Sequence, residues 1–149
     1  MSKRRIARGF MAASGIIEIF IAVVHFFWPF ALVGYGEFAG LSDDYRDILL
    51  LSSLAIGVCL CVFGLLSIYF SRRLAEGERS AWVFGISQGV LWLVRATLEV
   101  VYPVEVPLFF IARPSVIVLP MSVLIGLMYL VPLLLIRPEF RARGRDRKR

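Results

Sequence analysis

The sequence has little of what metal sites and hydrolytic active sites are built from. It contains one histidine, His25, and two cysteines, Cys59 and Cys61. Because the cysteines are two positions apart, on a helix they point about 200° away from each other and cannot share a metal ion or a disulfide. No serine stands beside His25 in a nucleophile motif, and the glycine patterns of phosphate-binding and dinucleotide-binding loops are absent. The sequence therefore carries no signature of a metalloenzyme, a hydrolase or a nucleotide-binding enzyme, and it indicates no catalytic residue.

Charged residues are also scarce, at 19% of the chain, whereas 59% of the residues are hydrophobic and the mean hydropathy is +0.79. A soluble domain of this length interleaves its apolar residues with more polar surface. Here the apolar residues fall into four blocks, at 10–33, 48–70, 82–102 and 115–136. Each block is close to the ~20 residues that cross ~30 Å of hydrocarbon as a helix. We therefore expect an all-α membrane protein, a bundle of four transmembrane helices over residues 10–136.

The positive charges lie on one side of the predicted membrane, and the net charge is +6. Basic residues cluster in a lead at 1–9, in the loop 71–80 and in an arginine-rich tail at 137–149, whereas the other loops contain only Arg46 and Arg113. Because Lys and Arg accumulate in cytoplasmic loops, this asymmetry predicts that both termini are cytoplasmic. The arginines of the tail are explained by their effect on the orientation of the protein in the membrane and by contact with anionic lipid, so we expect no nucleic-acid partner.

The third apolar block carries polar and charged residues at helical spacing. Gln88, Trp92, Arg95 and Glu99 follow one another at steps of four, three and four positions, which places them on one stripe of a helix. An Arg or Asp at the centre of a spanning helix costs roughly 2.5–3.5 kcal/mol on insertion scales. We therefore expect this stripe to face protein, trapped water or a ligand, and not lipid.

The first block carries Glu18 and His25, which are seven positions apart and so lie on nearly the same helix face. Counted from the cytoplasmic ends of the blocks, the depths of Glu18 and Gln88 agree to within roughly 3 Å, and so do those of His25 and Arg95. We therefore predict a two-tier polar seam between the first and third helices. In this seam Glu18 lies opposite Gln88, and His25 lies opposite Arg95 and Glu99.

A structural interpretation of the same residues stays open. Arg95 and Glu99 are four positions apart and could neutralise each other along their own helix. Glu18 could bond to Gln88 as a polar clasp between helices. On this interpretation the close helix contacts matter most, and the glycines expected to make them are Gly57, Gly64, Gly85 and Gly89.

A short motif closes the first block, where AVVHFFWP at 22–29 places His-Phe after a small residue and before a proline. The second block ends in FGLL at 63–66, and the basic segment RRLA follows at 72–75. In these segments the chain resembles the DoxX-like four-helix membrane proteins of bacteria. The resemblance covers the four-helix plan and residues 1–85. It implies a small protein of the bacterial inner (plasma) membrane, of a family whose members are in some cases tied to quinone-linked oxidoreductases.

These observations predict a small integral membrane protein that acts as a binding or accessory subunit for a small amphipathic, quinone- or lipid-like ligand in the outer half of the bilayer. Arg95 would hydrogen-bond a ligand oxygen while Glu99 offsets its charge, and His25 would donate or accept a proton. Trp28 and Trp92 would form apolar walls. The predicted ligand-binding residues are Glu18, His25, Trp28, Gln88, Trp92, Arg95 and Glu99.

Two other functions are compatible with the same pattern. The first is a helix-packing subunit of a larger membrane complex, which would bind protein partners and no small molecule. The second is a proton-coupled carrier that relays protons through Glu18 and His25. A chain of 149 residues would need to form a homo-oligomer to enclose such a pathway.

Overall fold

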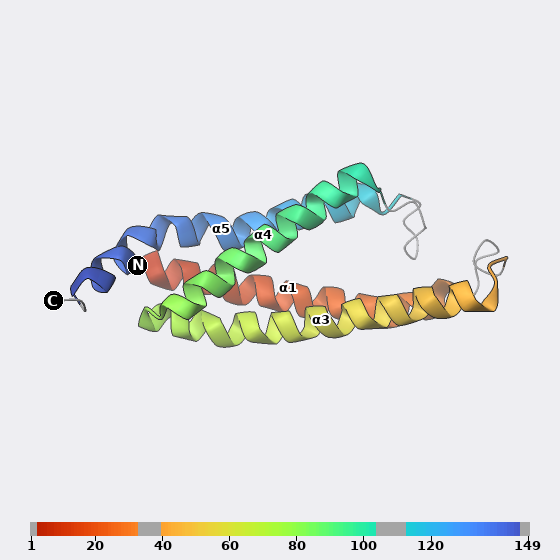
Figure 1. Cartoon of the computed structure of the whole chain (residues 1–149), viewed down its shortest axis with the longest axis horizontal. Coiled ribbons are helices and arrows are strands. Elements are labelled where there is room, and N and C mark those ends of the chain that lie inside the picture. Colours follow the sequence, from red (N-terminus) through yellow and green to blue (C-terminus); the bar gives the residue numbers. More distant parts are fainter. Residues whose placement is uncertain (1–2, 33–39, 104–112, 147–149) are drawn as a thin grey trace.

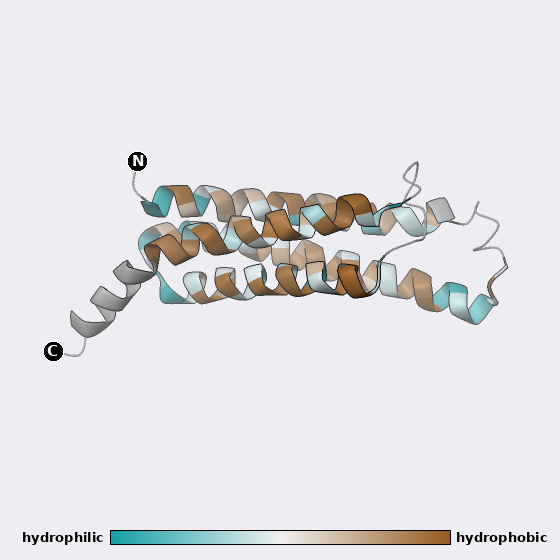
Figure 2. Ribbon diagram, turned by 90° about the horizontal axis from the view of Figure 1, so that it is seen from above, coloured by the Kyte–Doolittle hydropathy of each residue, from teal (hydrophilic) through white to brown (hydrophobic). Residues whose placement is uncertain are grey.

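The computed structural model describes residues 3–32, 40–103 and 113–146, and nearly all of them are helical. They form four helices, α1 (Lys3–Leu32), α3 (Asp43–Glu76), α4 (Arg79–Val101) and α5 (Ser115–Asp146). All four are long and apolar enough to cross a membrane. Hydrophobic residues follow one another along the middle of each helix, and hydrophilic residues gather towards the ends (Figure 2). The prediction of an all-α protein with four membrane-spanning helices is confirmed.

The helices extend beyond the predicted apolar blocks. Helix α1 begins at Lys3, inside the basic lead, and α5 continues to Asp146, inside the arginine-rich tail. A hydropathy block marks the part of a helix at membrane depth, whereas helical hydrogen bonding continues into charged segments as well. Helix α5 also runs past Pro120 and Pro132, so neither proline ends it.

Both termini lie at the same end of the bundle, which we call the termini end (Figure 1). Helices α1 and α4 run away from this end, and α3 and α5 return to it. The opposite end, where α1 and α4 finish, is the far end. The cytoplasmic placement of the termini end stays a prediction from the basic residues.

Neighbouring helices pack in chain order, α1 on α3, α3 on α4 and α4 on α5, and α5 returns to pack on α1. The most extensive contacts join α1 with α3 and α4 with α5, so the bundle consists of two helix pairs. The two pairs diverge towards the far end (Figure 1). Helices α1 and α4 therefore face each other diagonally across the interior.

Glycine allows a close backbone contact between α1 and α3. A Cβ atom at Gly64 would lie 2.6 Å from the carbonyl oxygen of Gly15, and a Cβ at Gly15 would lie 2.6 Å from that of Gly64. Farther along the same pair, a Cβ at Gly57 would lie 3.1 Å from the Phe26 ring. Small residues at helix interfaces permit such approach. The predicted contacts at Gly57 and Gly64 are present, and Gly15 is the partner that the sequence did not single out.

The glycines predicted on the third span face α5. A Cβ at Gly85 would lie 2.5 Å from Leu133 Cδ1, and a Cβ at Gly89 would lie 2.6 Å from Leu130 Cγ. Here the leucine side chains fill the space above the glycines. This packing turns the polar stripe of α4 to the bundle interior.

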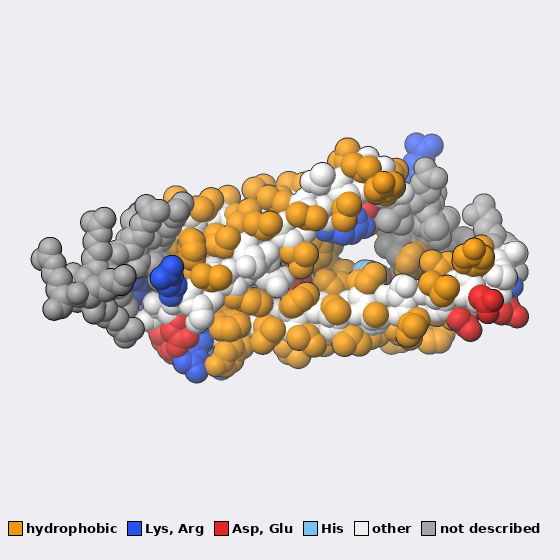
Figure 3. Space-filling model, in the orientation of Figure 1, with side chains coloured by type: hydrophobic (Ala, Val, Ile, Leu, Met, Phe, Trp, Pro, Cys, Tyr) orange, Lys and Arg blue, Asp and Glu red, His pale blue; other side chains and the backbone are white. Residues whose placement is uncertain are grey.

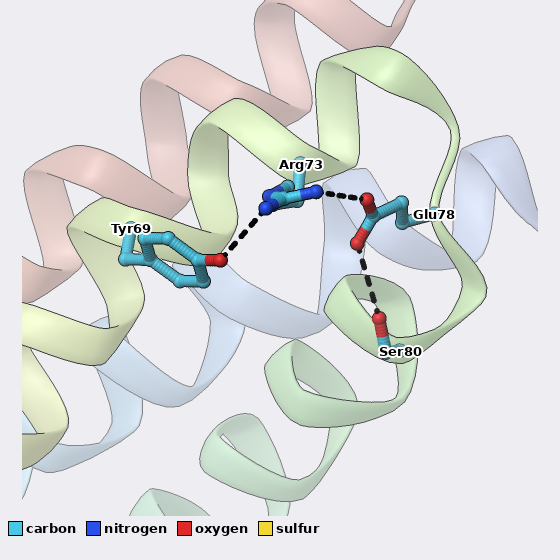
Figure 4. A network of polar contacts seen from close by, with 4 residues as sticks. All are labelled: Tyr69, Arg73, Glu78 and Ser80. Atoms are coloured by element: carbon cyan, nitrogen blue, oxygen red, sulfur yellow. Dashed lines mark hydrogen bonds and ion pairs between the residues drawn. The ribbon is translucent and has the colours of Figure 1, made fainter.

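A polar network closes the turn between α3 and α4 at the termini end (Figure 4). Gly77 ends α3 in the left-handed conformation, with φ 87°. Arg73 Nη1 donates to Glu78 Oε1 at 2.6 Å, and Arg73 Nη2 donates to the Tyr69 hydroxyl at 2.9 Å. Ser80 Oγ donates to the second Glu78 oxygen at 3.4 Å. The network joins the end of α3 to the start of α4.

Candidate functional site

Glu18 is buried at a point where all four helices meet. Its Oε1 accepts the Trp92 indole N–H at 2.6 Å, and its Oε2 accepts the Ser67 hydroxyl at 3.5 Å. The Tyr129 hydroxyl lies 2.5 Å from Ser67 Oγ and also hydrogen-bonds the Glu18 carboxyl. Each helix thus contributes one residue to this group, which we call the Glu18 cluster: Glu18, Ser67, Trp92 and Tyr129.

The Glu18 cluster stabilises the bundle through neutral hydrogen-bond donors. The indole and the two hydroxyls carry no charge: the Trp92 N–H donates to Oε1, and because Ser67 and Tyr129 have one proton each and also bond to each other, at most one hydroxyl proton is left for the carboxyl. A buried acceptor that loses its donor costs about 1–3 kcal/mol. The cluster joins α1 directly to its diagonal neighbour α4, and it does so where the two helix pairs are still close.

The predicted pairing of Glu18 with Gln88 is wrong. Trp92, one turn farther along α4, takes the position opposite Glu18. The predicted depths were counted from the starts of the apolar blocks, and α1 and α4 begin before these blocks. When depth is counted from the observed starts of α1 and α4, Glu18 and Trp92 lie at similar depth. Gln88 is buried, and its Oε1 has no hydrogen-bond partner among the residues that the structure describes.

Arg95 and Glu99 form an ion pair along α4, with Arg95 Nη2 2.6 Å from Glu99 Oε2. This is the pairing within one helix that the sequence left open. The Glu99 side chain is fully buried, whereas the Arg95 side chain is 38% exposed. Both residues lie on the stripe that contains Trp92, in which Gln88, Trp92 and Glu99 are buried and Arg95 is half-buried. An exposed side chain on an interior stripe indicates that the bundle is open at this level.

The opening is visible as a hollow between the α4–α5 pair and the α1–α3 pair (Figure 3). Basic and acidic side chains lie on its α4 side, and Arg95 and Glu99 are the charged residues of that half of α4. A histidine lies on its α1–α3 side. We call this space the far-end hollow. It follows from the divergence of the two helix pairs.

His25, the only histidine of the chain, makes local contacts. Its Nδ1 lies 2.9 Å from the carbonyl oxygen of Ile21, one turn earlier in α1. Its own carbonyl oxygen accepts the Ser53 hydroxyl of α3 at 3.0 Å. No direct contact joins His25 to Arg95 among the described residues, and whether the two lie opposite each other, as the predicted second tier has them, stays a prediction. Trp28, predicted as an apolar wall, is half-buried one turn farther along α1.

Ser67 and Tyr129, which complete the Glu18 cluster, were not predicted from the sequence. A signal for Ser67 was present in α3, whose buried face consists largely of small residues at helical spacing. That face comprises Ser53, Gly57, Gly64, Ser67, Ser71 and Leu74. Tyr129 carries the only phenol in its apolar block, and a buried Tyr hydroxyl usually finds a partner. Neither signal identifies which residue is the partner.

Comparison of this chain with models of known protein families, with characterised proteins and with solved structures finds no match.

Proposed function

We propose that this small integral membrane protein is a binding or accessory subunit that holds an amphipathic, quinone- or lipid-like molecule in the far-end hollow. The observation that carries the proposal is the Arg95–Glu99 pair, in which a fully buried carboxylate holds a guanidinium that stays 38% exposed on an interior stripe. Ionisable groups at membrane depth typically mark a site for a ligand, an ion or a proton.

The chemistry of the pair favours a neutral polar head group. A guanidinium carries five N–H donors, and the contact with Glu99 occupies only part of that fork. Because Glu99 balances the charge of Arg95, the pair attracts a carbonyl or ester oxygen more selectively than it attracts a free anion. A quinone carbonyl and the ester group of a lipid both fit this description.

His25 supplies the complementary function on the other side of the hollow. When Nδ1 donates to the Ile21 carbonyl, the neutral imidazole presents Nε2 as an acceptor. An acceptor at His25 and a donor at Arg95 suit a molecule that alternates between carbonyl and hydroxyl forms, as a quinone and its quinol do. Trp92, whose ring is held by its bond to Glu18, precedes Arg95 by about one turn on the same stripe of α4.

The resemblance to DoxX-like proteins supports the same proposal, because some members of that family are tied to quinone-linked oxidoreductases. We also propose the bacterial inner membrane as the location, with both termini in the cytoplasm. The far-end hollow then lies in the outer half of the bilayer. A respiratory complex or a second copy of the chain would be the natural partner of such a subunit.

The test compares two arginines in matched ion pairs. Arg95→Leu is combined with Glu99→Leu, because an apolar pair avoids leaving a buried carboxylate alone. The control is Arg73→Leu with Glu78→Leu at the termini end, where the N–O distance is also 2.6 Å. Binding of decylubiquinone to the purified protein is measured by quenching of tryptophan fluorescence.

Loss of the Arg95 pair should weaken binding roughly tenfold or more, because a hydrogen bond to a charged group contributes about 1.5–3 kcal/mol and 1.4 kcal/mol is a factor of ten. The control should bind like the unaltered protein. Equal affinity in all three proteins, or no binding by the unaltered protein to either decylubiquinone or a phospholipid, contradicts the proposal. Circular dichroism and thermal unfolding confirm that each variant is folded.

A further inference from the structure

Two buried polar atoms near the centre of the bundle lack hydrogen-bond partners. Ser14 Oγ and Gln88 Oε1 are unpartnered within the described parts of the chain, and their residues are 0% and 5% exposed. Ser14 precedes Glu18 by one helical turn, and Gln88 precedes Trp92 by one turn. Because α1 and α4 run in the same direction and Glu18 contacts Trp92, Ser14 and Gln88 lie at the same level of the interior.

We infer that ordered water binds in this layer, between Ser14 of α1 and Gln88 of α4. Buried polar groups in proteins are almost always hydrogen-bonded, and internal water serves those that side chains do not reach. The inference is independent of the proposed ligand in the far-end hollow, since it concerns the opposite side of the Glu18 cluster.

The polar groups of the layer favour a neutral molecule that can donate hydrogen bonds to them. Gln88 Oε1 only accepts, and the Ser14 hydroxyl both donates and accepts. Ser71 lies one turn beyond Ser67 on α3, and its hydroxyl donates to the Ile68 carbonyl at 2.7 Å, so its oxygen retains an acceptor site. Water supplies two donors and two acceptor sites. The Glu18 carboxyl is already occupied by the indole and hydroxyl donors of its cluster, which disfavours a metal cation there.

The layer is closed on both sides. The Glu18 cluster covers it towards the far end. Towards the termini end a group of fully buried apolar residues fills the interior: Ala7, Met11, Leu74, Ala81, Leu133 and Ile136. The Glu18 cluster and this apolar group therefore bound the layer on both sides along the helix axes. The arrangement is a closed site and does not favour a carrier.

Thermal unfolding of the full-length protein in detergent tests the inference, because the two possibilities shift the melting temperature in opposite directions. If the layer is dry, Gln88→Met removes an unsatisfied acceptor and raises the melting temperature. If water is bound, the same substitution removes one of its partners and lowers the melting temperature by about 2–4 °C. Ser14→Ala should act in the same direction as Gln88→Met.

The double variant sharpens the result. With shared water, the second substitution costs less than the first, so the combined shift is smaller than the sum of the two single shifts. Water-to-amide cross-relaxation in NMR should be present at Ser14 and Gln88 and absent at the buried Ala22. A raised melting temperature in either single variant, additive shifts, missing cross-relaxation, or a stability that depends on NaCl but not on choline chloride would each overturn the inference.

Discussion

Two arginine–glutamate pairs of this protein have the same N–O distance and different surroundings. Arg73 with Glu78 and Arg95 with Glu99 both show an N–O distance of 2.6 Å, and the arginine side chains are 42% and 38% exposed. The carboxylates differ, because Glu78 is 38% exposed and Glu99 is fully buried. The first pair lies at the turn between α3 and α4 (Figure 4), and the second lies within a membrane-spanning helix.

The exposed pair at the turn is explained by its contribution to the fold, whereas the presence of the buried pair needs another explanation. At the turn, Tyr69 and Ser80 extend the network, and water and salt weaken the attraction between the charges. Within the membrane, desolvation of Glu99 opposes the attraction, and an apolar pair of similar size is often as stable or more stable. Stability alone therefore does not account for the charges at this position, and this supports the proposal of a ligand beside Arg95.

The largest expected effect is that of breaking the buried pair. Arg95→Leu alone leaves Glu99 buried without its cation and should destabilise the protein by about 3–5 kcal/mol. Arg73→Leu should cost far less, because water solvates Glu78 when the arginine is gone. Unfolding titrations in mixed detergent micelles measure both. Similar losses in the two variants would show that the buried and exposed pairs are equivalent.

A second prediction concerns Glu18, the carboxyl held without a cation. Trp92→Phe removes the indole N–H and leaves Glu18 Oε1 unsatisfied, so it should cost about 1–3 kcal/mol. The matched control is Trp82→Phe, which removes an N–H donated to the Leu133 carbonyl at 2.9 Å from a half-buried position. The same unfolding titrations should show a smaller loss for the control. A smaller loss for Trp92→Phe would indicate that Glu18 obtains its hydrogen bonds elsewhere.

The contrast between Glu18 and Glu99 also shows how far sequence reasoning reaches. Residue spacing was sufficient to predict four spanning helices and to place Gln88, Trp92 and Glu99 on one buried stripe of α4. Spacing also offered Glu99, one turn away, as a possible partner of Arg95, and the structure shows this ion pair.

The partners between helices could not be predicted in the same way. Depth along a helix follows from residue counts, whereas the neighbours of a helix follow from how all side chains pack together. The diagonal placement of α1 and α4 depends on contacts such as that of Gly15 with Gly64, and no local pattern encodes this contact. Depths counted from the ends of the apolar blocks therefore suggested Gln88 as the partner of Glu18, and Ser67 and Tyr129 were not predicted.

The smallest expected effect distinguishes the two ion pairs by salt. Attraction between exposed charges is screened over a Debye length of about 10 Å at 0.1 M salt and about 3 Å at 1 M, whereas buried charges are screened much less. The stability lost in Glu78→Gln should therefore shrink as NaCl rises from 0.1 to 1 M, while the loss in Glu99→Gln should stay constant. Melting temperatures of the two variants and the unaltered protein across this range measure both trends. A salt-dependent loss in Glu99→Gln would mean that ions and water reach the pair from the far-end hollow, and the site would then be an aqueous one, unsuited to the membrane-soluble ligand that we propose.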